Sequence, residues 1–116
     1  MIKVFEKEKN GFSIVLKSDG WQMAIVTYAE QYDVKNHTKM ARHMTTDEVF
    51  ALIEGDATLC TINKNDGIEK IPLEKNKIYC IEKGTWHSLV LSEDAVLVAT
   101  ENENIKPEDT EKKVLL

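Results

Sequence analysis

A histidine and a glutamate stand five residues apart in the segment RHMTTDEVFALIEG (residues 42–55), where Glu48 is followed by five apolar residues. A carboxylate among apolar neighbours is costly to bury unless a metal ion, a cation or a hydrogen-bond donor compensates it. The segment fits two structures. One is a short helix with Thr45 as N-cap, Glu48 completing a capping box and Gly55 as the stop signal. The other is a strand that brings His43 and Glu48 to one pocket.

The elements on either side favour the strand. A helix of about nine residues here would be apolar on every side instead of along one stripe. As a strand, the even-numbered residues from Glu48 to Leu52 share one face and the odd-numbered ones share the other. Short runs rich in Val, Ile, Thr and Tyr recur at roughly ten-residue spacing, which is typical of an all-β sandwich or barrel. Asp66-Gly67 is the strongest hairpin signal between them. The expected strands are 12–17, 21–29, 48–53, 57–62, 68–73, 77–81, 87–91 and 95–100.

The length of 116 residues predicts a single domain, and folding at this size buries roughly two-thirds of the surface of the unfolded chain. We expect its core to span about residues 12–100. Residues 101–116 are expected to form a C-terminal tail, either a loose arm or a strap whose last apolar residues pack back onto the barrel. Cys60 and Cys80 make no C-x-x-C pair, and both are expected to be buried free thiols.

Charge and hydropathy exclude two classes of partner. The formal net charge is -5, and the Lys and Arg residues are scattered, so binding to a nucleic-acid backbone is not expected. No apolar run approaches the ~20 residues that a membrane helix needs. The N-terminal sequence MIKVFEKEKN is charged where a signal peptide would be apolar. These features predict a cytoplasmic protein without membrane contact.

The segment around His43 also pairs with a second one, NKIYCIEKGTWHSLVL (residues 76–91). The first contains His-x4-Glu-x6-Gly and the second Gly-x2-His, ending at His87. In this order they resemble the two motifs of the cupin superfamily, Gly-x5-His-x-His-x3,4-Glu-x6-Gly and Gly-x5-Pro-x-Gly-x2-His-x3-Asn. The resemblance spans about half of the chain, from His43 to Leu91. Cupins are small jelly-roll barrels, so it implies an all-β, cupin-like jelly-roll β-barrel.

The chain departs from the cupin pattern at five positions. Ala41 stands where the first histidine of His-x-His belongs, and alanine cannot bind a metal. The other four are Lys35 and Asn76 in place of glycines, Glu82 in place of proline and Leu91 in place of asparagine. Asparagine is second to glycine in tolerating a left-handed backbone, so that exchange costs little.

Carried over residue by residue, the resemblance implies metal ligation by His43, Glu48 and His87, with no fourth ligand at position 41. Two imidazoles and a carboxylate suit Zn, Fe, Mn or Ni, and three protein ligands leave a position for water. A separation of five places His43 and Glu48 on opposite faces of a straight strand. The residues between them must therefore bend the chain. His87 shares a face with Leu89 and Leu91 and should point into the barrel.

The resemblance implies a range of functions that includes dioxygenases, isomerases, epimerases, decarboxylases and barrels that only bind a ligand. The leading prediction is a divalent-metal-binding barrel that takes a small organic molecule. Catalysis of the oxygenase or isomerase type is one function open to such a barrel, and the sequence does not decide whether it is an enzyme. The alternative is a metal-free barrel that binds a small ligand such as a carbohydrate without catalysis. Ala41 favours the alternative, and the retained ligands favour the first.

Three further expectations concern the surroundings of the site. The barrel has sheet edges to protect, which predicts a homodimer. Lys39 and Arg42 are expected to be solvated near the barrel mouth, where either could meet an anionic substrate. His37 lies outside the motif spacing and is expected at the surface. A metal-free sugar-nucleotide isomerase with a histidine base is less favoured, because no second acid–base residue stands at a convincing spacing.

Overall fold

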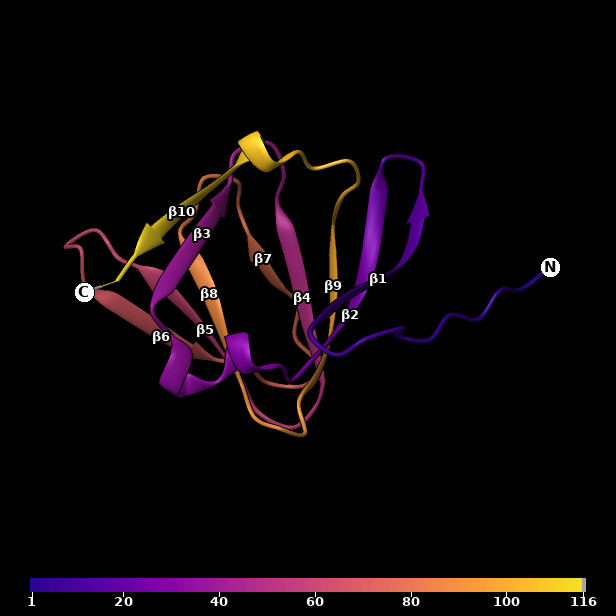
Figure 1. Ribbon diagram of the computed structural model, residues 1–116, viewed down its shortest axis with the longest axis horizontal. Coiled ribbons are helices and arrows are strands. Elements are labelled where there is room, and N and C mark those ends of the chain that lie inside the picture. The colour runs from indigo at the N-terminus through magenta and orange to yellow at the C-terminus, as the bar shows by residue number, and fades with distance from the viewer. Residues whose placement is uncertain (116) are drawn as a thin grey trace.

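The computed structural model describes residues 1–115 and contains ten strands in two antiparallel sheets, with three short 3-10 helices in the connections (Figure 1). One sheet has the strand order β1 (Phe12–Ser18), β2 (Trp21–Thr27), β9 (Val96–Asn102), β4 (Glu48–Glu54) and β7 (Tyr79–Ile81). The other has the order β10 (Thr110–Val114), β3 (Lys39–His43), β8 (His87–Leu91), β5 (Ala57–Ile62) and β6 (Ile68–Pro72). The all-β jelly roll expected from the sequence is confirmed.

The core lies between the two sheets because their strands alternate apolar and polar residues. Val26 of β2 and Leu97 of β9 belong to one sheet and are fully buried. Leu59 and Leu91 belong to the other sheet and are also buried. Side chains of opposite strand faces point in opposite directions, so each sheet contributes one apolar face to a common core. Within the described residues, no helix is long and apolar enough to cross a membrane.

The segment that follows His43 is a strand and not a helix. In β4, burial alternates from Glu48 through Leu52, and Glu48, Phe50 and Leu52 are the buried positions. Gly55 ends the strand with a φ of +72°, and a Cβ there would lie 2.7 Å from the backbone of Ala95. The glycine is therefore required twice, by its left-handed backbone and by the close approach of another chain segment.

The chain bends between His43 and Glu48, as their odd separation requires. His43 is the last residue of β3 and Glu48 is the first residue of β4, and the two strands belong to different sheets.

Asn76 has a φ of +67°, in keeping with asparagine replacing glycine in a left-handed turn. The connection from β2 to β3 carries η1 (Glu30–Tyr32) and η2 (Val34–Asn36).

The C-terminal segment extends the fold beyond the core boundary expected near residue 100. After η3 (Pro107–Asp109), residues 110–114 form β10, which pairs with β3 as an edge strand of the second sheet. Thr110 lies opposite His43, so this segment reaches the site itself. At the other end, residues 1–10 run away from the body of the molecule (Figure 1).

One expectation about the cysteines is wrong. Both are free thiols, and Cys60 is buried as expected, but Cys80 is exposed. Cys80 belongs to β7, which has three residues and lies at the edge of its sheet. Its neighbours Tyr79 and Ile81 pack against the core, so Cys80 between them faces outward.

Candidate metal site and ligand pocket

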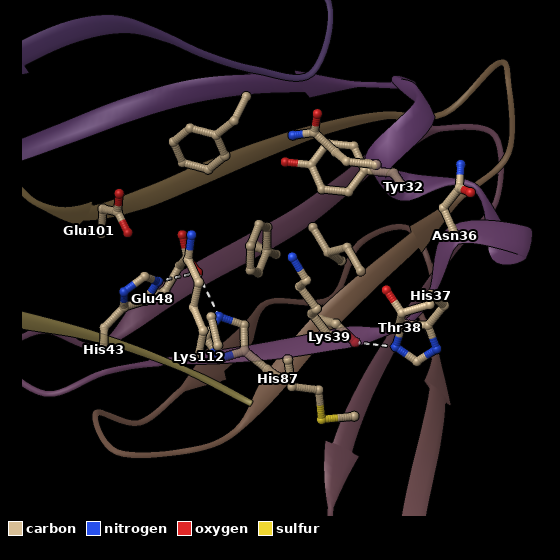
Figure 2. A pocket seen from close by; sticks show the side chains of 17 residues that line it. Tyr32, Asn36, His37, Thr38, Lys39, His43, Glu48, His87, Glu101 and Lys112 are labelled. Atoms are coloured by element: carbon tan, nitrogen blue, oxygen red, sulfur yellow. Dashed lines mark hydrogen bonds and ion pairs between the residues drawn. The ribbon is translucent and has the colours of Figure 1, made fainter. Parts of the chain in front are cut away.

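Three side chains from three strands converge at one end of the space between the sheets. His43 comes from β3, Glu48 from β4 and His87 from β8, so the structure brings together all three residues that the sequence singled out (Figure 2). One donor atom from each of the three residues can be chosen so that all lie within 4.8 Å of one another. Among residues 1–115, no other histidine, cysteine or acidic group joins this cluster by that criterion.

Glu48 lies at the centre of the cluster. Its Oε1 is 3.1 Å from Nε2 of His87 and 3.6 Å from Nε2 of His43. The ring centroids of the two histidines are 5.3 Å apart. Both imidazoles face the carboxylate of Glu48 with their Nε2 atoms. This arrangement offers two nitrogens and one oxygen to a common point.

The other nitrogen of each ring is held by a hydrogen bond. Nδ1 of His87 lies 2.9 Å from the backbone oxygen of Thr85, and Nδ1 of His43 lies 3.0 Å from Oγ1 of Thr110. A backbone oxygen accepts only, so His87 donates from Nδ1, and its neutral form has a free lone pair on Nε2. Partners of this kind fix the orientation of histidines that bind metals.

Burial and charge act in opposite directions on the central carboxylate. Glu48 is 4% exposed. Burial raises the pKa of its carboxyl, but the imidazoles of His43 and His87 outweigh burial and lower the pKa to about 2. In turn, the contact with Glu48 raises the pKa of His43 above its ordinary value of 6.5, against the opposing effect of burial. Glu48 is therefore an anion in the folded protein at neutral pH.

A second carboxylate, which the sequence analysis did not single out, lies directly across the sheet from the first. Glu101 of β9 is the register partner of Glu48. Its Oε1 accepts a hydrogen bond of 3.0 Å from Nε2 of Gln22, while Oε2 is buried with no partner among the described residues. Burial and repulsion from Glu48 raise the pKa of Glu101 to about 7. The sequence contains a signal for this position, because every second residue of a strand shares one face. Leu97 and Ala99 point inward, so Glu101 is expected to point inward as well.

The donor set fits a divalent cation. Like charges directly opposite each other in a sheet are destabilising, and an orphaned buried carboxylate oxygen adds to that cost. A doubly charged ion held by the cluster would balance the charges of Glu48 and Glu101. Two imidazoles with carboxylate oxygen also match the ligand preference of Zn, Fe, Mn and Ni. The residues present therefore suit the metal that the cupin pattern implies.

The cluster opens into a cavity of about 630 Å³ between the sheets, which is large enough for a small organic molecule. In Figure 2, His43, Glu48 and Glu101 lie at one end of this pocket, and Tyr32, Asn36 and His37 lie at the other. The 3-10 segments between β2 and β3 provide that far end. A ligand in the pocket would therefore meet charged donors at one end and mainly neutral polar groups at the other.

Ala41 lies on the inward face beside the cluster. It is the register partner of His87 on one side and of Lys112 on the other, and all three line the pocket. Because side chains alternate along β3, Ala41 shares its face with His43. Its methyl group leaves the space in which the cupin pattern has a histidine. Lys112 could not be placed there from the sequence, because it lay in the expected tail.

The remaining candidates from the sequence lie elsewhere. His37 is not part of the cluster, although it lines the far end of the pocket, where its Nε2 lies 2.5 Å from Oγ of Ser88. The guanidinium of Arg42 forms an ion pair of 2.6 Å with Glu111 and lies 4.5 Å from the ring centroid of Trp86. Arg42 alternates with Ala41 along β3 and therefore faces away from the pocket.

Comparisons with known proteins show the fold. No protein-family model and no curated protein matches the chain. A cupin-2 domain protein from Shewanella frigidimarina is 19% identical, and the match covers 84% of this chain and 83% of that one, with a TM-score of 0.61. A variant of Streptomyces Pac13 solved with uridine is 12% identical, covers 100% of this chain and 94% of its own, and has a TM-score of 0.69. The protein therefore has the cupin fold.

The third similar structure is a longer protein. The Fe(II) form of HppE is 12% identical, with a TM-score of 0.61, and the match covers 78% of this chain but 48% of HppE. The chain thus spans about half the length of HppE. Pac13 is described as a nucleoside dehydratase, and HppE is also solved with Co(II) and a substrate. These are proteins of the same fold, each with a small molecule or a metal of its own.

Proposed function

We propose that this protein binds one divalent transition-metal ion through His43, Glu48 and His87 and takes a small organic molecule in the adjoining pocket. The observation that carries the proposal is the pair of carboxyl groups of Glu48 and Glu101, which lie directly opposite each other on neighbouring strands, with Oε2 of Glu101 buried. A pair of imidazoles completes the donor set. The iron and cobalt forms of HppE support the same kind of site on this fold.

Within such a site, the residues of this chain have separable tasks. The Nε2 atoms of His43 and His87 and a carboxylate oxygen of Glu48 would hold the ion, and Thr85 and Thr110 keep the rings oriented. The bound ion would act as a Lewis acid on an oxygen of the substrate.

Glu101 lies beside the three ligands, and its pKa of about 7 lets its carboxyl exist in either protonation state near neutral pH. It is therefore suited to accept or release a proton next to the substrate. Glu101 is thus given two tasks in this proposal: its negative charge would help to hold the cation electrostatically, and its carboxyl would act as an acid or a base.

A second candidate is a metal-free barrel that binds a small ligand without catalysis. One observation favours it: Oε1 of Glu48 lies 3.1 Å from Nε2 of His87, so a ring that carries a proton on this nitrogen donates to the carboxylate without an ion. Ala41 also removes one donor from the cupin set. The ligand would be of the size of a nucleoside or a sugar, since the pocket measures about 630 Å³ and uridine occupies Pac13 on the same fold.

Calorimetric titration with Mn²⁺ or Zn²⁺ separates the two candidates. The protein is purified without an affinity-tag nickel column, treated with chelator and then titrated. We expect one ion per chain, and Glu48→Gln should weaken binding by at least tenfold, because it removes a ligand charge while keeping the shape of the side chain.

The matched control is Glu54→Gln, an exposed carboxylate at the other end of β4. It should leave metal affinity unchanged. Absence of binding by the wild-type protein at millimolar metal would refute the metal proposal and favour the ligand-binding barrel. Equal affinity of wild type and Glu48→Gln would remove Glu48 from the site.

A further inference from the structure

Two lysines line the pocket that also contains the cluster of His43, Glu48 and His87. Lys39 begins β3, and Lys112 lies in the middle of β10. Both residues are exposed, and their side chains extend into the pocket in Figure 2. The pocket therefore has two cationic groups beside a cluster that is otherwise made of imidazoles and carboxylates.

The register of the two strands allows both ammonium groups to reach one point. Lys112 is paired with Ala41 and Val114 is paired with Lys39, so the two lysines are diagonal neighbours on one face of the sheet. Diagonal neighbours in an antiparallel pair have Cα atoms about 7–8 Å apart, which long side chains bridge. One anionic group placed between them could contact both.

Neither lysine has an acidic partner inside the protein. Among residues 1–115, neither ammonium group has a carboxylate oxygen within 4.0 Å. On the outer surface, by contrast, Arg42 pairs with Glu111 and Lys77 pairs with Glu74. The chain has a net charge of -5, so two cations on one inward face are not part of a generally basic surface.

The position of the lysines relative to the cluster sets the shape of the ligand. Lys112 stands opposite Ala41, one strand away from His87. Lys39 is four residues from His43, which is roughly 13 Å along an extended strand. An anion held by both lysines therefore lies beside the metal ligands and not among them, and the rest of the molecule spans the distance to the cluster.

We propose that the ligand of this pocket is a small organic oxyanion, a carboxylate or a phosphate monoester, whose charged group is bound by Lys39 and Lys112. Its other end lies against His43, Glu48 and His87. Ammonium groups bind such oxyanions as point charges. This inference rests on the proposed function in that the pocket is a small-molecule site, but it does not require the metal.

The test uses pairs of probes that differ in the charged group. Ribose is compared with ribose 5-phosphate, and glucose with glucuronate, each titrated into chelator-treated, ¹⁵N-labelled protein and followed by amide chemical shifts. We expect the anionic member of at least one pair to shift the amides of Lys39, Ala41 and Lys112 at concentrations where the neutral member does not. Its affinity should fall as salt is raised.

Variants assign the effect to the two lysines. Lys39→Met and Lys112→Met should each weaken binding of the anionic probe about tenfold. Lys113→Met is the matched control, because Lys113 is the next residue of the same strand and its ammonium group lies outside the pocket, 5.9 Å from the ring centroid of Trp86. It should leave the affinity unchanged.

Three results would overturn the inference: neither anion binds, the neutral members bind as well as the anions, or Lys113→Met weakens binding as much as Lys112→Met. Metal affinity is measured calorimetrically on the same samples. Normal metal binding without preference for anions would defeat this inference and leave the proposed metal site intact. Selective anion binding without metal binding would support this inference and refute the proposed metal site.

Discussion

Replacement of Glu101 by glutamine should make the metal-free protein more stable at pH 8 while weakening its affinity for metal. The glutamine keeps an oxygen that can accept the hydrogen bond from Gln22, now 3.0 Å long, and it removes the negative charge opposite Glu48. A change that only disturbed packing would lower both quantities. Opposite signs for stability and metal binding are therefore the signature of a carboxylate that is held in place for a cation.

The magnitude follows from the pKa of Glu101, which is raised from 4.5 to about 7. That difference corresponds to about 3.4 kcal/mol between the two protonation states. Part of the Glu101 carboxyl is accessible to solvent, so screening reduces the effect, and we expect ~1–2 kcal/mol. Because the pKa is raised in the folded state, this contribution to stability is fully present below about pH 4.5 and is lost as the pH rises through about 7. The Glu101→Gln variant has no carboxyl at this position and therefore does not lose this stability as the pH rises.

Urea unfolding of chelator-treated wild type and Glu101→Gln at pH 5 and pH 8 measures the effect. The two proteins should have similar unfolding free energies at pH 5, and the variant should be more stable at pH 8. Excess Mn²⁺ should then stabilise the wild type more than the variant, since only binding to the folded state adds stability. A variant less stable than wild type at both pH values would refute the reasoning, as would unchanged metal affinity.

Three other predictions follow from single positions. Ala41→His adds a nitrogen donor on the inward face and should tighten Zn²⁺ or Mn²⁺ binding in calorimetry, and equal affinities would show that position 41 does not face the ion. Gly55→Ala should cost about 2 kcal/mol or more in urea unfolding, because its Cβ would lie 2.7 Å from backbone. Gly20→Ala, with no atom within 4 Å, should cost less. A thiol reagent should modify exposed Cys80 rapidly, whereas Cys60, whose thiol pKa burial raises, should react only on unfolding.

The sequence predicted β4 and its inward face because the evidence was local. Alternation from Glu48 through Leu52 has the period of a strand, and an apolar surface on every side is unsuitable for a surface helix. The bend after His43 followed from the odd number of residues between the two side chains. The sequence could not predict that His43 and Glu48 come from different sheets, because sheet membership depends on pairing with distant strands.

The parts of the site that the sequence missed belong to strands with weak patterns. The segment TEKKV of β10 has one apolar residue, as suits an exposed edge strand, and only its pairing with β3 makes it a strand. Thr110 and Lys112 enter the site through that pairing. The inward direction of Glu101 could have been predicted from the alternation of side chains along its strand, but the strand was expected to end at residue 100.

The homodimer stays a prediction, and light scattering that gave a monomer mass at micromolar concentration would contradict it.

The absence of a histidine at position 41 fits the rest of the pocket as one arrangement of charge. The small side chain of Ala41 lies opposite Lys112 on the neighbouring strand, and both residues line the pocket. In the metal proposal, a divalent ion would balance the carboxylates of Glu48 and Glu101. The two ammonium groups of Lys39 and Lys112 are then the charge that remains in the pocket. The metal proposal accounts for the paired carboxylates, and the oxyanion proposal accounts for the lysines, so each explains charge that the other leaves uncompensated.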